Sequence, residues 1–200
     1  MTSTKKTEIE IRTTSSEVII GKTERGRSGA GRRVQGYALL FNTPSDALDF
    51  EEVILPGALD GVIEKSNVFA LLNHDSSRGI LARCKSGKGT LKLEIDSKGL
   101  LYSFDAPNTA LGDELLEYLK RGEVSESSFA FTVKEDIWEK VGTKTTRTIK
   151  RFDELFDVSP VYDATYSKTT VSARAIDRKA KAEELAEYYA ELNKWINQIN

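Results

Sequence analysis

The sequence predicts a β-rich α+β protein built around one hydrophobic core. The chain has 200 residues, of which 39% are hydrophobic, and this is enough to bury the core of a single domain. From Arg33 onward it contains a series of short apolar segments separated by turn residues, as expected of strands. One segment, which ends at Gly122, instead repeats leucine at a helical spacing.

The N-terminal residues predict two short strands followed by a loop. Apolar and polar residues alternate in Glu8 to Arg12, and an apolar run ends the segment Glu17 to Ile20. The next segment, Gly21 to Arg33, is rich in glycine and arginine and is expected to be a mobile loop. Neither its glycines nor the later SGKGT string have the order of a phosphate-binding loop, so none is predicted.

Seven further strands and one helix are predicted from the apolar patterns. In TALGDELLEYLKRG, Leu111, Leu115 and Leu119 recur every four residues, acids precede bases and Gly122 ends the pattern, which predicts an α-helix. The helix lies between the fifth and sixth strands. The strand segments are VQGYALLF, NVFALLNH, ILARC, TLKLEID, GLLYSFDA, SSFAFTVKEDIWEK and TRTIKRFDELFDVSPVY.

The C-terminal residues predict an amphipathic helix. Their composition changes after Arg174, and apolar residues recur at spacings of three and four. The helix either packs on its own domain or binds a partner, and the sequence leaves both open. We therefore divide the chain into residues 1–32, with the N-terminal strands and loop, a main domain at 33–175, and the C-terminal helix at 176–200. The apolar stripe consists of Leu185, Tyr188, Leu192, Trp195 and Ile199.

Composition narrows the range of functions. A net charge of −2 gives no general attraction to nucleic acid or to an anionic membrane. No apolar run is long enough for a membrane span or has the form of a secretory signal, so we expect a cytoplasmic protein. Cys84 and His74 are the sole residues of their types, so neither a zinc site nor any other cofactor is expected.

His74 is a candidate general base because imidazole titrates near neutral pH. Its partner would be a nucleophilic serine. Ser127 and Ser128 lie where a turn enters a strand, which could hold either of them rigidly. Ser76 and Ser77 are too close to His74 in the chain. A lone histidine in a structural role remains an alternative to all of these.

Two acids are candidates for the group that orients His74. Asp75 is its neighbour in the chain, but neighbouring side chains of an extended chain point to opposite faces, which makes it a poor partner. Asp157 would share one face of a strand with Ser159, with Phe156 on the other face. The residues favour Asp157, but they do not decide the assignment by themselves.

Seven blocks of the sequence, in this order and spacing, resemble the prohead maturation protease family of tailed bacteriophages. The resemblance covers approximately residues 36–174. The blocks are GYALLFN, FEEVILPGAL, LLNHD, ILARC, KGLLYSF, LLEYLKRGEVSESSFAF and LFDVSPVYDATYSKTTVSAR.

The resemblance implies a serine endopeptidase that is similar in fold to the herpesvirus capsid-assembly proteases. That fold is a closed or nearly closed β-barrel with surrounding helices. Members of the family act inside the immature capsid, in the cytoplasm of the host cell. They cleave scaffolding segments or the major capsid protein, and commonly themselves. The implied partners are therefore the capsid or scaffolding protein and other copies of the chain, with no role for nucleic acid or membrane.

The resemblance also implies the catalytic residues. His74 matches the family's general base and Ser128 its nucleophile, while Asp157 stands where the family usually has glutamate. Backbone amides near Ser128, together with Arg83, are candidate oxyanion donors. Three departures from the family pattern leave open an alternative, a catalytically inactive assembly module on the same fold, which the heptad-like C-terminal stripe also favours. They are Ala130 and Ala82 in place of glycine, and DATY after the V-S-x-V segment. A small-molecule acyl hydrolase is disfavoured because SESSFAF lacks the glycines of a nucleophile elbow.

Overall fold

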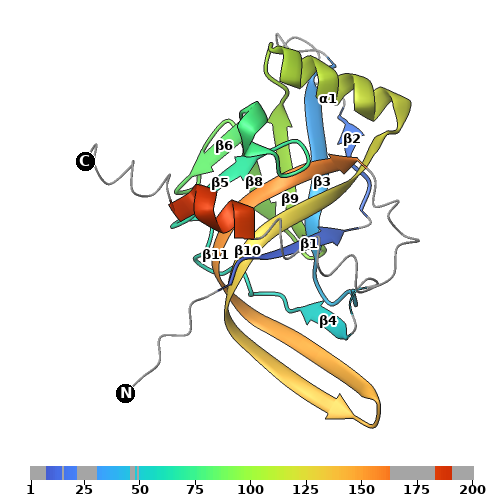
Figure 1. The fold of residues 1–200 in the computed structure, drawn as a ribbon, viewed down its shortest axis with the longest axis vertical. Coiled ribbons are helices and arrows are strands. Elements are labelled where there is room, and N and C mark those ends of the chain that lie inside the picture. The colour runs from blue at the N-terminus through green and yellow to red at the C-terminus, as the bar shows by residue number, and fades with distance from the viewer. Residues whose placement is uncertain are drawn as a thin grey trace.

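The computed structural model describes residues 8–14, 16–21, 31–45, 48, 50–162 and 183–190. These residues form two β-sheets, an α-helix between β9 and β10, and a short helix near the C-terminus (Figure 1). Every predicted strand segment contains a strand of the structure. Two further strands, β4 and β7, were not predicted.

The larger sheet has the strand order β1, β10, β11, β5, β6 and β7, and β4 also pairs with β11. The pairs of β11 with β4 and with β5 are parallel, and the other pairs are antiparallel. The strands are β1 (Glu10–Thr14), β4 (Glu51–Ile54), β5 (Asn67–Ala70), β6 (Ala82–Lys85), β7 (Lys88–Gly89), β10 (Val124–Val141) and β11 (Lys144–Tyr162).

The smaller sheet is antiparallel and has the order β2, β3, β9 and β8. Just before β2, the amide of Val18 donates to the carbonyl of Ser125, at the start of β10, at 3.1 Å. This bond links the two sheets. The strands are β2 (Ile19–Ile20), β3 (Arg33–Leu40), β8 (Lys92–Ile95) and β9 (Gly99–Asp105).

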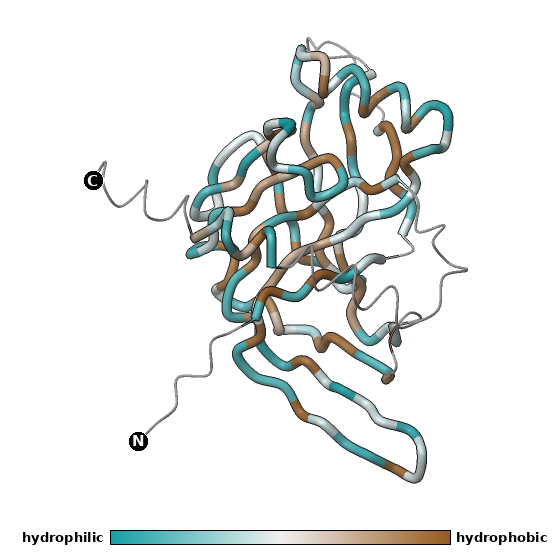
Figure 2. The backbone as a smooth tube through the Cα atoms, in the orientation of Figure 1, coloured by the Kyte–Doolittle hydropathy of each residue, from teal (hydrophilic) through white to brown (hydrophobic). Residues whose placement is uncertain are grey.

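The expectation of a closed or nearly closed barrel is wrong, although the β-rich class with few helices is confirmed. A barrel requires hydrogen bonds between the first and last strands of a sheet. Among the described residues, the larger sheet ends at β1 and β7 and the smaller sheet at β2 and β8, and neither closes on itself. The two sheets instead share a core, to which β9 contributes Tyr102 and β10 contributes Phe129. The hydropathy colouring of Figure 2 shows apolar segments on the central strands.

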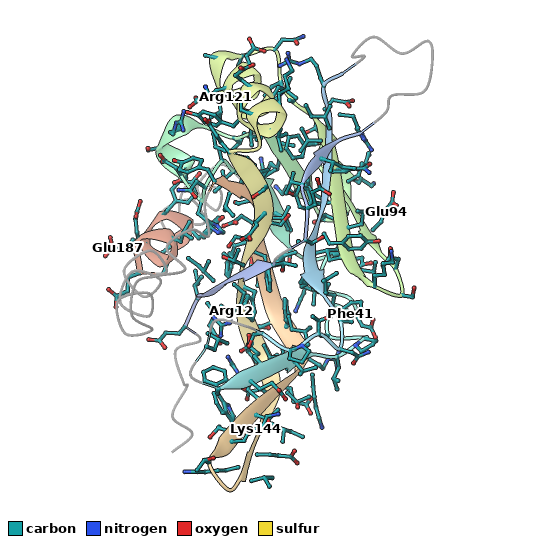
Figure 3. All side chains as sticks on the ribbon, turned by 90° about the vertical axis from the view of Figure 1, so that its right-hand side faces the viewer. Arg12, Phe41, Glu94, Arg121, Lys144 and Glu187 are labelled. Atoms are coloured by element: carbon teal, nitrogen blue, oxygen red, sulfur yellow. The ribbon has the colours of Figure 1, made fainter. Side chains whose placement is uncertain are left out.

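Strands β10 and β11 form one long hairpin that links the core to a projecting arm. They pair from Val124 with Tyr162 to Val141 with Lys144. The outer half of the hairpin extends away from the rest of the molecule, and Lys144 lies at its far end (Figures 1 and 3). The inner half is buried, so the same two strands contribute both to the arm and to the interior.

The helix α1 (Ala110–Arg121) confirms the prediction from the leucine spacing. Thr109 caps its N-terminus, where the side chain accepts a bond from the amide of Gly112 at 3.3 Å. Gly122 ends it in the left-handed conformation, with φ of 74°. Leu115 is completely buried, so α1 packs its apolar face on the core.

Residues 183–190 form a helix that packs on its own domain. Leu185 and Tyr189 are buried in a small apolar cluster with Phe69 and Phe156, while Tyr188 is half-buried. The predicted stripe thus includes two residues that contact the domain, and its remaining members, Leu192, Trp195 and Ile199, lie outside the described residues. So does most of the predicted Gly/Arg loop. In the described part of the chain, no helix is long and apolar enough to cross a membrane.

Candidate active site

His74 lies in a tight loop after β5. Its backbone and that of Asn73 both have positive φ, at 58° and 55°, which is uncommon for residues other than glycine. The amide of Asn73 donates to the carbonyl of Pro160 at 3.0 Å, and this bond fixes the loop to the end of β11. The loop that carries His74 is therefore placed by a backbone bond from Asn73 to a distant strand.

Ser128 is the serine that the structure brings to His74. Its Oγ lies 2.6 Å from Nε2 of His74, and its side chain is 1% exposed. Ser127 points to the opposite face of β10, where its hydroxyl bonds that of Tyr102 at 3.1 Å. The geometry thus separates two serines that the sequence pattern could not.

Asp157 is the acid that reaches His74. Its Oδ1 is 2.7 Å from Nδ1 of His74, and the carboxylate is fully buried. The distance is that of an ion pair, although the ring N–H is not aligned with the oxygen as in an ideal hydrogen bond. Asp75 is used elsewhere, since its carboxylate accepts bonds from the amide and the hydroxyl of Ser77. The serine, histidine and acid proposed from the sequence therefore meet in space.

Two further side chains hold the Asp157 carboxylate. The hydroxyl of Ser159 donates to Oδ1 at 2.8 Å, so these residues share a face of β11 as expected. The hydroxyl of Tyr189, from the helix at 183–190, donates to Oδ2 at 3.3 Å. The sequence pattern does not single out Tyr189, because its neighbour Tyr188 is the residue that fits the heptad spacing.

Strand β1 covers the serine from the other side. Thr13 pairs with Ser128 across the sheet, and the Ser128 hydroxyl lies 2.8 Å from the carbonyl oxygen of Arg12, to which it donates. A serine has one hydroxyl proton, so it can donate either to this carbonyl or to His74. In the docked position, β1 therefore competes with the histidine for the proton.

An ion-pair network fastens β1 to the domain. Glu10 and Arg12 on β1 bond Arg147 and Glu52 respectively, at 2.5 and 2.6 Å, and Arg147 also bonds Asp136 at 2.7 Å. Burial by itself would raise the pKa of Glu10, but the hydrogen bond and charge of Arg147, together with the charge of Arg12, outweigh burial and lower it. Glu10 is consequently held as a carboxylate.

Arg83, considered from the sequence as an oxyanion donor, has other partners. Its Nε donates to the side chain of Asn67 at 2.7 Å, and its guanidinium lies over the ring of Phe69, 5.3 Å from the centroid. In the described part of the chain, no bond joins it to Ser128 or His74. The same part contains no group of three or more residues able to ligate a metal.

The chain resembles known phage proteases in sequence and fold. A model of the caudovirus prohead serine protease family matches residues 18–184. The capsid assembly protease gp21 of bacteriophage T4 has a similar structure, with a TM-score of 0.53 and 10% identity, and the match covers 78% of this chain and 98% of that one. At this identity the likeness shows the fold alone. No protein with a curated description matches the sequence.

Proposed function

Because the chain belongs to the prohead serine protease family of tailed bacteriophages, we propose that it is a serine endopeptidase with Ser128 as nucleophile, His74 as general base and Asp157 as orienting acid. The observation that carries the proposal is that His74 lies between the two other residues. Its Nε2 is 2.6 Å from Oγ of Ser128, and its Nδ1 is 2.7 Å from Oδ1 of Asp157. A nucleophile, a base and an orienting acid in this order are what acyl transfer requires.

The reaction follows from these contacts. As Oγ of Ser128 attacks the carbonyl carbon of a peptide bond, Nε2 of His74 takes the hydroxyl proton and then transfers it to the departing amine. An ester between the serine and the substrate's carbonyl carbon remains. Water attacks this ester with the same histidine as base, which releases the acid and restores the serine. Asp157 stabilises the imidazolium in both halves.

We further propose that the substrates are the capsid or scaffolding proteins of the immature phage capsid, and copies of this chain. The support is the family to which the chain belongs. The shorter Asp157 in place of the usual glutamate is compatible with this function, since its carboxylate already lies at ion-pair distance from His74. Ala130 in place of glycine is also accommodated, because its methyl group packs in the cluster with Ile11 and Phe156.

Co-expression with the phage's capsid and scaffolding proteins tests the proposal, with the new termini mapped by mass spectrometry. The wild-type chain should generate defined new termini, Ser128→Ala should generate none, and Ser127→Ala is the matched control that should retain cleavage. Termini that persist in Ser128→Ala would assign the nucleophile elsewhere. If wild type and Ser128→Ala are equally inactive, and a fluorophosphonate does not label Ser128 in wild type, the inactive assembly module is the better description.

A further inference from the structure

The outer side of the Asp157 carboxylate is covered by the helix at residues 183–190. Tyr189 is 4% exposed, and its ring packs against Phe156 and Phe69, with centroid distances of 4.8 and 6.1 Å. From this position its hydroxyl donates to Oδ2 at 3.3 Å. A residue 32 positions further along the chain thus contacts the acid that we propose for catalysis.

The carboxylate needs this donor because its surroundings are apolar. Asp157 is fully buried beside a cluster that includes Phe69, Leu71 and Phe156. A buried carboxylate without hydrogen-bond donors is strongly disfavoured. Oδ1 is shared by His74 and Ser159, whereas in the described part of the chain Tyr189 is the one side chain that donates to Oδ2.

Tyr189 remains a donor under all ordinary conditions. Burial raises the pKa of its hydroxyl well above 10, and the negative charge of Asp157 raises it further. The other titratable groups facing this pair are His74 from the loop, Tyr188 from the same helix and Glu154 from β11. None of the three donates to Oδ2.

We propose that Tyr189 is a positioning residue, which stabilises and partly neutralises the Asp157 carboxylate by a hydrogen bond to Oδ2, so limits its attraction for the imidazolium of His74, and thereby makes docking of the helix at 183–190 part of the active site. The proposal rests on the proposed function in so far as Asp157 acts on His74 during catalysis. The ring contacts place the tyrosine, and the hydroxyl acts on the carboxylate. These two roles can be separated, because phenylalanine retains the ring.

The single histidine of the chain allows a direct test. In the full-length protein labelled with ¹⁵N-histidine, the ring nitrogens of His74 are followed by NMR as the pH is varied. Tyr189→Phe leaves Oδ2 without its side-chain donor, so the negative charge of Asp157 is less neutralised and attracts the imidazolium proton more strongly. We expect the midpoint of the His74 titration to rise by about half a pH unit relative to wild type.

Tyr188→Phe is the matched control, because it removes a hydroxyl from the adjacent ring of the same helix, and it should leave the midpoint unchanged. An unchanged or lower midpoint in Tyr189→Phe would overturn the proposal, and so would an equal shift in the control. Amide spectra of each variant establish that the helix remains docked.

Labelling of Ser128 by a fluorophosphonate separates this inference from the proposed function. Tyr189→Phe should be labelled about three- to tenfold more slowly than wild type. The acid limb of its plot of labelling rate against pH should move in the same direction as the NMR midpoint. The NMR result does not depend on any reaction of the serine. A shifted midpoint with no labelling of wild type would therefore reject the proposed function while the contact stands, and normal labelling with no shift would reject the role of Tyr189.

Discussion

Replacing Glu10 by glutamine should make Ser128 more reactive, because it weakens the attachment of β1. The Ser128 hydroxyl donates to the carbonyl of Arg12, so in the docked position this carbonyl competes with His74 for the hydroxyl proton. Glu10 anchors the first residue of β1 through bonds to both terminal nitrogens of Arg147, at 2.5 and 2.8 Å. Glutamine keeps the size of the side chain but removes the charge from these bonds.

The size of the effect follows from the contacts. A hydrogen bond between charged groups contributes roughly 1.5–3 kcal/mol. The Glu10 side chain is 22% exposed and glutamine retains part of the bonding, so we take the low end, about 1.5 kcal/mol. If β1 must leave before Ser128 reacts, this loss raises the population of the open form, and with it the labelling rate, roughly tenfold.

The assay is the second-order rate constant for fluorophosphonate labelling of Ser128 at neutral pH. Glu123→Gln is the control, since Glu123 pairs with Arg121 at the exposed end of α1 and, among the described residues, has no bond to β1. It should react at the wild-type rate. Equal rates for Glu10→Gln and wild type, in a folded protein, would refute the idea that β1 restricts the serine.

The network should also respond to acid. The pKa of Glu10 is lowered in the folded protein from its ordinary value of 4.5. The stabilising contribution of Glu10 is therefore fully present above the ordinary pKa, and it is lost as the pH falls through the lower pKa of the folded protein. Amide hydrogen exchange in β1 should accelerate below about pH 4.5 relative to exchange in β9.

Two further substitutions test the site and the fold. Asp157→Asn should reduce turnover by about 10⁴-fold, because the amide favours the wrong tautomer of His74. Asp75→Asn should reduce turnover far less. The measurement is kcat on a cleaved peptide, and the reverse ranking of the two variants would reassign the acid. Gly112→Ala should destabilise the protein by about 1–3 kcal/mol in urea unfolding, although alanine usually favours a helix, because a Cβ would lie 2.0 Å from the carbonyl oxygen of Pro107. A gain in stability would show that the start of α1 can shift.

Most strands and the helix α1 could be predicted because their patterns are local. Alternating apolar residues and a leucine repeat that ends in glycine depend on no distant partner. Strand β4 was missed because two acids, Glu51 and Glu52, interrupt its pattern. Glu52 is 4% exposed, and its charge is paired with Arg12 and Arg147 from distant parts of the chain. The residues near Glu52 in the sequence do not indicate these ion pairs, because both partners are distant in the chain.

Part of the candidate site could likewise be predicted from the sequence, and part could not. The proposed serine, histidine and acid could be named through the family resemblance, while the residues alone left Ser127 and Asp75 open. Ser127 is separated from Ser128 by the face of β10 that the fold turns toward Tyr102, and Asp75 is removed by a local capping bond to Ser77. Tyr189 could not be found, because the contact with Asp157 joins a helix to a strand well before it in the chain. The expectation of a closed barrel came from the family resemblance. Whether a sheet closes depends on which strands pair at its edges, and the sequence of a single strand does not specify this pairing.

The long hairpin has a mechanical consequence for Ser128. The arm exposes Ile137, Trp138 and Val141, while the same strand carries the serine at its inner end. Four of the five register shifts along β10 fall between Ala130 and Asp136, that is, between these two regions. Bulges bend and twist a strand locally, so these register shifts set the direction in which the arm leaves the domain. Arg147, on the arm side of the shifts, bonds Glu10 of β1, so a load on the arm would reach the strand that contacts Ser128 through this ion pair.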